Sequence, residues 1–287
     1  MQPGQTERIF SFELFPPKTE AGFEKLRKTV TELKALGPAF FSVTYGAGGS
    51  TQQRTFEAVD WLRAEAIPAA PHLSCVGSRR EEIVTILERY KAQGINRLVA
   101  LRGDLPSGTG LSGLGELRNA NQLVELVREC FGDHFHIEVA AYPEFHPQAL
   151  SPKKDLDYFK LKVEAGADSA ITQYFYNPDA YFRFVEDCRR LQIEIPIVPG
   201  IMPITNFVQL ARFSDACGAE IPRWLRKRLE GFGDDLEAIR SYGTDAVTRL
   251  CERLLEGGAP GLHFYTMNQA TASKAVWNNL GLKRTPS

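Results

Sequence analysis

A single carboxylate stands inside an apolar segment near the start of the chain. Glu13 lies in residues 9–14, a run that predicts a strand, and Pro16 and Pro17 follow it closely. A carboxyl group there must be paired, hydrogen-bonded or partly dehydrated, and dehydration favours its proton-donating form near neutral pH. The sequence therefore indicates general-acid chemistry at Glu13, with a structural ion pair as the alternative.

Other polar side chains come at the ends of later apolar runs. Arg102 and Asp104 put a guanidinium and a carboxylate on one turn, and Gly103 between them permits close backbone approach. This turn suits a phosphate group or the polar edge of a ring, although an ion-paired loop has the same residues. If each run is a strand and all of the strands end on the same face of the fold, these polar groups border one pocket. The remaining ones are Thr44, Tyr45, His72, Tyr142, Glu144, His146, Gln173 and Tyr265.

Two short motifs match known binding patterns, but their positions relative to the predicted strands and helices argue against those functions. Gly108, Gly110 and Gly113 satisfy the dinucleotide pattern G-x-G-x-x-G, but they come several residues after the preceding run and no helix opens at the third glycine. We interpret this segment as a flexible loop over the pocket. His134 and His136 precede a predicted strand, which places them on the face opposite the pocket, so we expect no metal site.

Composition and charge exclude several classes of protein. The chain has 287 residues, 43% hydrophobic and 24% charged, which is typical of folded proteins and not of disordered ones. A formal net charge of -1 leaves no field that would gather nucleic acid or anionic lipid. No apolar run approaches the ~20 residues of a spanning helix, the first residues do not resemble a secretory signal, and no Cys-x-x-Cys occurs. We therefore expect a cytoplasmic protein with reduced thiols and no nucleic-acid or membrane partner.

The elements that must position these groups alternate along the whole chain. Short apolar runs are followed by segments with helical spacing, and most successive runs begin about 30 residues apart, which fits a strand, a crossover helix and two loops. Residues 202–261 add helix before the last run without a linker-like composition, so we predict one domain over residues 1–287. The pattern predicts an α/β fold, the (β/α)8 TIM barrel, with a doubly wound open sheet as the alternative. The runs begin near Ile9, Phe40, Ala69, Arg97, Ile137, Ser169, Pro196 and Leu262.

Beyond these patterns, the chain resembles the methylenetetrahydrofolate reductase family, in the short form that consists of the catalytic domain alone. The resemblance covers residues 9–280, and the order and spacing of its motifs both agree. The matching stretches are SFELFPPK at residues 11–18, SVTYG at 42–46, APHL at 70–73, ALRGDLP at 100–106, AYPEFHP at 141–147, ITQYF at 171–175, PGIMP at 199–203 and HFYTMN at 263–268.

The resemblance implies a barrel that binds FAD without a Rossmann domain. Such an enzyme takes a hydride from NADH or NADPH and passes it, in a ping-pong reaction, to methylenetetrahydrofolate, which gives methyl-tetrahydrofolate for methionine synthesis. The folate and the nicotinamide dinucleotide are then the small-molecule partners, and we also expect a homo-oligomer. The family's FAD-contacting positions fall on Thr44, His72, Arg102, Asp104, Tyr142, His146, Asp155 and Lys162.

The resemblance also assigns roles in the reaction. Glu13 matches the general acid that protonates a folate ring nitrogen, so that the five-membered ring opens to an iminium. Asp104 matches a carboxylate near the pterin and the flavin, where its charge stabilises the developing cation. Gln173, Phe213 and Tyr265 match substrate-binding positions.

The chain departs from the family pattern at the periphery of this site. Gln269 stands where some relatives carry arginine, and residues 107–118 form a longer loop than we expect of the short form. Tyr158 and Leu161 stand where relatives place polar contacts to the adenosine, and residues 119–120 lack an aromatic side chain that would pack on the cofactor. These contacts are therefore not carried over to this chain.

Three other readings compete with the reductase. A pterin-binding methyltransferase barrel would hold folate without a flavin and pass a methyl group to a corrinoid or a thiol. A binding module for flavin or folate would have no catalytic activity. Proline dehydrogenase shares the cofactor and the general architecture but would oxidise proline.

Overall fold

Parallel strands form the centre of the molecule. The computed structural model describes residues 8–45, 52–103 and 115–282. Within these ranges the strands pair in the order β7-β6-β5-β4-β3-β2-β1-β9-β8, and each pairing is parallel. Their bounds are β1 (Ile9–Leu14), β2 (Phe40–Val43), β3 (Ala69–Ser74), β4 (Arg97–Leu101), β5 (His136–Ala141), β6 (Ser169–Thr172), β7 (Ile197–Val198), β8 (Gly200–Ile201) and β9 (Gly261–Tyr265).

The two strands at the ends of this order are neighbours in the chain. β7 pairs with β6 and β8 pairs with β9, and only Pro199 separates β7 from β8. The ladder breaks there because proline has no N–H to donate, although the carbonyl of Pro199 still accepts from the N–H of His263 at 3.0 Å. The sheet therefore closes, which confirms the TIM barrel over the open sheet. The single seventh strand predicted from the sequence is corrected to two.

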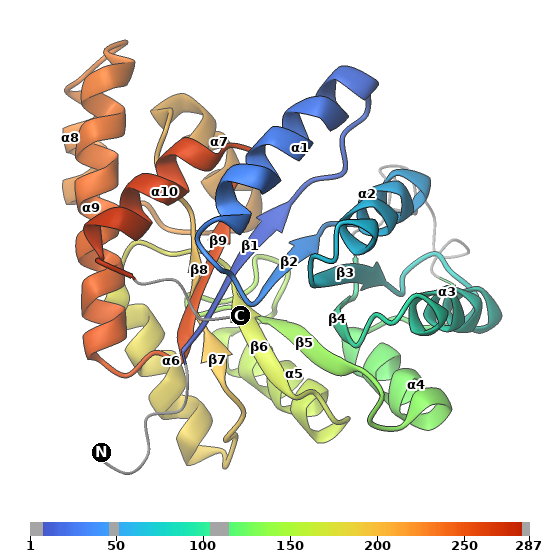
Figure 1. Cartoon of the computed structure of the whole chain (residues 1–287). Coiled ribbons are helices and arrows are strands. Elements are labelled where there is room, and N and C mark those ends of the chain that lie inside the picture. The colour runs from blue at the N-terminus through green and yellow to red at the C-terminus, as the bar shows by residue number, and fades with distance from the viewer. Residues whose placement is uncertain (1–7, 46–51, 104–114, 283–287) are drawn as a thin grey trace, which may run out of the picture.

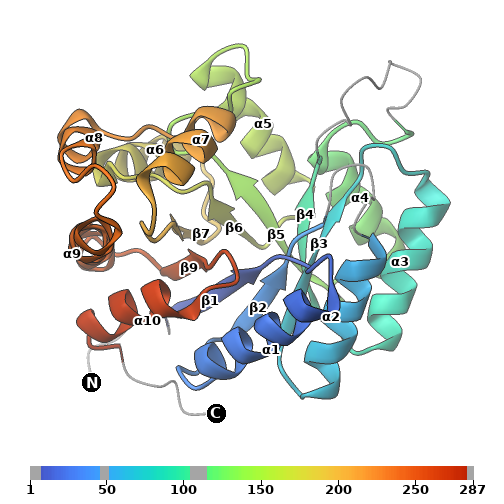
Figure 2. The same cartoon turned by 90° about the horizontal axis from the view of Figure 1, so that it is seen from above.

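Helices surround the strands in both views (Figures 1 and 2). They connect successive parallel strands, as the alternating pattern predicts. Their bounds are α1 (Glu20–Lys34), α2 (Gln52–Ala64), α3 (Arg80–Ala92), α4 (Ala120–Phe131), α5 (Pro152–Glu164), α6 (Pro178–Arg190), α7 (Phe207–Cys217), α8 (Arg223–Glu230), α9 (Leu236–Glu256) and α10 (Ala270–Asn279).

Helical spacing decides which face of each helix packs on the barrel. In α1, the side chains of Phe23, Leu26, Val30 and Leu33 are buried at intervals of three and four residues. Thr19 caps this helix, because its Oγ1 accepts from the N–H of Gly22 at 3.1 Å. The amphipathic pattern therefore determines which face of the helix packs on the strands. The carboxyl ends of the strands stay available for polar side chains.

The long interval before the last strand holds α7, α8 and α9. α8 and α9 lie together at one edge of the barrel in both views, where they extend the helical layer (Figures 1 and 2). Asp235 caps α9, since its Oδ1 accepts from the N–H groups of Glu237 and Ala238. Among the helices in the described ranges, none is long and apolar enough to cross a bilayer.

A buried carboxylate network occupies the amino-terminal end of the barrel. Glu138 on β5 is 2% exposed, bonds to the Arg97 guanidinium, and accepts from Ser169 Oγ at 2.5 Å. His136 Nε2 lies 2.7 Å from Ser169 Oγ and 3.5 Å from Glu138 Oε1. Burial alone would raise the pKa of Glu138, but the hydrogen bonds from His136 and Ser169 and the charge of Arg97 outweigh it and lower the pKa. The two sequence-predicted histidines thus lie away from the pocket, and the described residues hold no metal-binding cluster.

Replacing Glu138 by leucine is expected to lower the free energy of unfolding by about 3 kcal/mol at pH 7, because Arg97 loses a buried partner. The lowered pKa means that the carboxylate stabilises the fold above the unfolded-state pKa and loses this effect as pH falls through the folded-state value. Urea unfolding at pH 7 and in acid measures both. The exposed Glu24→Ala change should cost under about 0.5 kcal/mol. A gap between Glu138→Leu and the parent that stays constant into acid would contradict the argument.

Candidate active site at the carboxyl ends of the strands

Two adjoining cavities open at the carboxyl ends of the strands. The Glu13 cavity has a volume of about 580 Å³, and the Lys162 cavity has about 340 Å³. Ligand sites of TIM barrels lie at this end, where the loops after the strands meet. A common wall separates the two cavities; it consists of Leu101, Ala140, Tyr142, His146 and Gln148.

Glu13 lies on the wall of the larger cavity and faces two histidines. Its side chain is largely buried, and its Oε2 lies 3.5 Å from His72 Nε2 and 3.7 Å from His263 Nε2. Burial lowers the pKa of His72 to about 4, although the Glu13 charge opposes this effect. His72 is therefore neutral at pH 7, and the contact is not an ion pair at that pH. Within the described ranges, Glu13 has no lysine or arginine at salt-bridge distance, which argues against the structural alternative.

His263 is a site residue that the sequence reasoning missed. It lies on β9, is fully buried, and its Nδ1 lies 2.7 Å from Ser11 Oγ on β1. Side chains of a strand alternate between its two faces, so His263 and Tyr265, two residues apart, point to the same side. This alternation, applied to the predicted substrate residue Tyr265, was the signal that could have found His263.

The three predicted substrate residues lie together on the same cavity. Gln173, Phe213 and Tyr265 line it with Glu13, and Phe213 reaches it from α7 with 38% of its surface exposed. The Tyr265 hydroxyl donates to the carbonyl of Thr172 at 2.7 Å, which fixes the ring over the end of β6. Gly200 makes room for that ring, because a Cβ there would lie 2.6 Å from a Tyr265 ring carbon.

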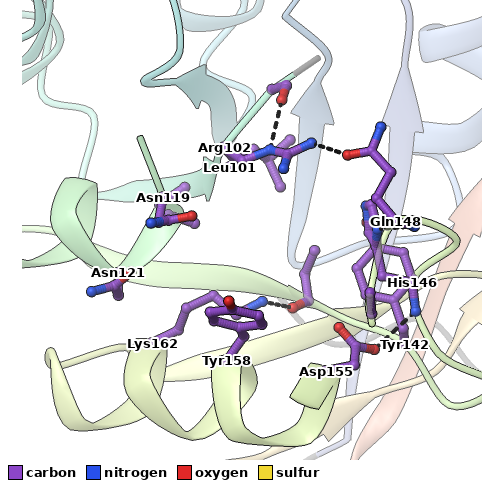
Figure 3. A pocket seen from close by; sticks show the side chains of 15 residues that line it. Leu101, Arg102, Asn119, Asn121, Tyr142, His146, Gln148, Asp155, Tyr158 and Lys162 are labelled. Atoms are coloured by element: carbon purple, nitrogen blue, oxygen red, sulfur yellow. Dashed lines mark hydrogen bonds between the residues drawn. The ribbon is translucent and has the colours of Figure 1, made fainter. Parts of the chain in front are cut away.

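The Lys162 cavity gathers cations and hydrogen-bond donors (Figure 3). Lys162 on α5 donates to the carbonyl of Ala140 at 2.5 Å, and burial lowers its pKa to about 8 while Asp155 opposes the shift. Across the cavity, Nη2 of the Arg102 guanidinium donates to Gln148 Oε1 at 2.5 Å. Two positive groups at one concave site form a place for an anion of the size of a phosphate or pyrophosphate.

The loop between β5 and α5 is fixed by the side chains of its own His146 and of Asp155 on α5. Asp155 Oδ2 accepts from the N–H of His146 at 2.9 Å, and His146 Nδ1 accepts from the N–H of Gln148 at 3.0 Å. The rings of Tyr142 and His146 pack edge to face with centroids 4.7 Å apart. This loop therefore presents a preformed wall to both cavities.

Most of the residues predicted as ligand contacts are brought together. Arg102, Tyr142, His146, Asp155 and Lys162 line the Lys162 cavity, and His72 lines the Glu13 cavity from within β3, not from its end as the sequence suggested. Asp104 lies outside the described residues, as do Gly108, Gly110 and Gly113 of the predicted covering loop.

Two further residues differ from the prediction. Thr44 directly follows β2 at the same end of the barrel, where its N–H donates to the carbonyl of Leu14, but it lines neither cavity. Gln148 was missed, since an exposed amide in a loop has no sequence pattern of its own.

The fold and the site define a (β/α)8 barrel with an acid-bearing ligand cavity at the carboxyl ends of its strands. The family model "Methylenetetrahydrofolate reductase" matches residues 2–281. The chain belongs to the methylenetetrahydrofolate reductase family.

Curated relatives agree with this assignment. Methylenetetrahydrofolate reductase (NADH) 1 of Arabidopsis thaliana is 40% identical over 293 residues, which cover 98% of this chain and 49% of the plant protein. The 5,10-methylenetetrahydrofolate reductase of Escherichia coli strain K12 is 39% identical over 274 residues, which cover 95% of this chain and 90% of the bacterial protein. The chain thus spans about half the length of the plant relatives and nearly all of the bacterial one.

Solved structures share the fold. A Clostridium thermocellum protein, described as binding two copies of 5-methyl-5,6,7,8-tetrahydrofolic acid, superposes with a TM-score of 0.69 at 19% identity and covers 96% of this chain and 94% of its own. A thermostable aldo-keto reductase reaches a TM-score of 0.54 at 13% identity, covering 99% and 93%. At these identities the likeness concerns the fold alone.

The lowered pKa of Lys162 predicts a pH-dependent anion site. Because the Lys162 ammonium loses its proton near pH 8 when no ligand is bound, the affinity for inorganic pyrophosphate should fall as pH rises from 7 to 9. The Lys162→Met protein should bind pyrophosphate about 10- to 100-fold more weakly at pH 7 and lose most of that pH dependence. Isothermal titration calorimetry measures both. The surface change Lys274→Met serves as a control, and a pH dependence in Lys162→Met equal to that of the parent would contradict the assignment.

Proposed function

We propose that this barrel, over residues 1–287, is a catalytic domain that reduces methylenetetrahydrofolate to methyl-tetrahydrofolate with FAD and NADH or NADPH. Family membership and the names of the curated relatives support the reaction, and the plant names support NADH. The folate bound by the Clostridium thermocellum protein of the same fold is consistent with this substrate. The cytoplasmic location and the homo-oligomer expected from the sequence stay predictions.

One observation carries the proposal: among the described residues, a buried carboxyl group lies without a lysine or arginine partner on the wall of a cavity large enough for a pterin. The groups nearest to Glu13 Oε2 in these contacts are the Nε2 atoms of His72, which is neutral at pH 7, and of the buried His263, at 3.5 and 3.7 Å. A carboxyl group in such a place can hold a proton and donate it to a bound base. The adjoining Lys162 cavity supplies the anion site that a reductase with a dinucleotide cofactor needs.

The residues of the Lys162 cavity fit FAD. Lys162 is half-buried, yet in the described part of the chain no carboxylate lies within 4.0 Å of its Nζ, so the site can accept a ligand's negative charge. Lys162 and Arg102 would hold the pyrophosphate, and Tyr142 and His146 on the common wall would direct the ring system toward Glu13. Asn119 and Asn121 add amide groups on the α4 side (Figure 3).

The chain's own residues then divide the work. When bound, FAD would supply hydride transfer between the nicotinamide and the folate. Glu13 would deliver a proton to the folate ring nitrogen, and opening of that ring gives an electrophilic iminium carbon. Gln173 would hydrogen-bond the pterin edge, while Phe213 and Tyr265 would pack on the substrate and exclude water.

Replacing Glu13 by glutamine should separate the two halves of the reaction. Reduction of bound FAD by NADH needs no proton from Glu13 and should stay within about twofold of the parent, whereas folate reduction should slow at least about 100-fold. Rapid mixing that follows flavin absorbance measures each half alone. Equal losses in both halves would refute the role of Glu13, and a colourless protein that FAD cannot reconstitute would favour the methyltransferase barrel.

The role of Asp104 rests on the family resemblance. Asp104→Asn should still bind FAD, but folate reduction should slow about 10- to 100-fold because the cationic iminium loses a nearby negative charge. Flavin content after purification and single-turnover folate reduction test the two statements. Normal folate turnover would remove Asp104 from the reaction.

A further inference from the structure

The turn between β9 and α10 carries two successive residues in a strained backbone conformation. Met267 has a φ of 51° and Asn268 has a φ of 53°, in the left-handed region that side chains other than glycine seldom adopt. In the described ranges, these are the only two consecutive residues other than glycine with positive φ. Such strain persists where surrounding contacts hold it, and it gathers at functional sites. Met267 lines the Glu13 cavity, so this turn belongs to the site.

The conformation lets the Asn268 side chain act as a strand partner. Its Oδ1 accepts from the Phe15 N–H at 2.9 Å, and its Nδ2 donates to the Phe15 carbonyl at 2.8 Å. Phe15 directly follows β1, whose pairing with β9 ends at Glu13 and Tyr265. The next residues are Pro16 and Pro17, which have no N–H to donate. The amide of Asn268 therefore extends the ladder beyond the point where the backbones stop pairing.

Further bonds tie the same turn to the backbone of Glu13. Thr266 Oγ1 donates to the Glu13 carbonyl at 2.6 Å and accepts from the N–H of Asn268 at 3.1 Å. The Asn268 carbonyl in turn accepts from Thr29 Oγ1 on α1 at 3.1 Å. The turn thus joins β1, α1 and β9, and the backbone is held at Glu13 and again two residues later at Phe15.

We propose that Asn268 is a positioning residue for the acid: its bidentate bond to Phe15 fixes the backbone beside Glu13, so that the carboxyl group points at the folate. This rests on the proposed function of Glu13. Asparagine suits the position because its side chain both donates and accepts, and because it tolerates left-handed φ better than most residues. The amide does not contact the reacting atoms; it acts through the backbone of β1.

Asn268→Gly tests the role without adding strain, since glycine accepts the left-handed φ while removing both bonds to Phe15. FAD content and the rate of flavin reduction by NADH should match the parent within about twofold. The rate of folate reduction should fall about 10- to 100-fold, mostly in kcat and not in KM, because a displaced acid loses alignment more than substrate binding.

Asn268→Asp keeps the acceptor for the Phe15 N–H but loses the donor to the Phe15 carbonyl, so it should also slow folate reduction while flavin reduction stays within about twofold of the parent. Asn279→Gly is the matched control, because it removes one amide hydrogen bond, to Thr248, at the other end of α10. That variant should keep both half-reactions.

The outcomes separate the two proposals. If the parent neither holds FAD nor reduces the folate, the proposed function fails. If the parent does both, the positioning role fails when Asn268→Gly and Asn268→Asp slow both halves equally, when neither slows folate reduction, or when Asn279→Gly has the same effect. If Asn268→Gly does not fold, Asn268→Asp decides by the same criteria.

Discussion

The absence of a cation beside Glu13, within the described part of the chain, is the constraint that gives the site its character. Three strands contribute to this: β1 carries Glu13, its neighbour β9 carries His263, and β3, which β2 separates from β1, carries His72. Barrel closure brings these side chains to one interior, where burial keeps His72 neutral at pH 7. A carboxyl group without a cationic partner can exchange a proton with a ligand, whereas pairing with arginine favours the ionised form.

The opposite end of the same barrel shows that contrast with the same residue type. Glu138 is as deeply buried as Glu13, but it bonds to Arg97 and Ser169, and these contacts with His136 lower its pKa. Such a carboxylate stays charged and stabilises the fold. The two buried carboxyl groups, one at each end of the strands, therefore differ in the partners that surround them. This difference agrees with the division of TIM barrels into a ligand-binding face and a stabilising face.

Sequence patterns predicted the parts of this molecule that depend on periodicity. The alternation of apolar runs and helical segments located the starts of the predicted strands within one residue. The break at Pro199 was not predicted, because the cost of a missing N–H depends on which strand lies beside it. Gln148 and His263 were not predicted for a related reason. Gln148 contacts Arg102 and His263 contacts Ser11, and both partners are distant in sequence and come near only in the folded barrel.

Lys162 lowers the stability of the fold at a site that is suited to an anion. Its pKa of about 8 lies below that of an exposed lysine, so the unfolded chain binds the proton more tightly than the folded one at neutral pH. Without a ligand, the free energy of unfolding should therefore rise as pH increases from 8 through the lysine value of the unfolded chain. An anion that pairs with the ammonium removes this penalty, and a ligand that binds only the folded state stabilises it further. The same half-buried cation that lowers the stability of the unliganded fold would thus couple folding to the binding of an anion.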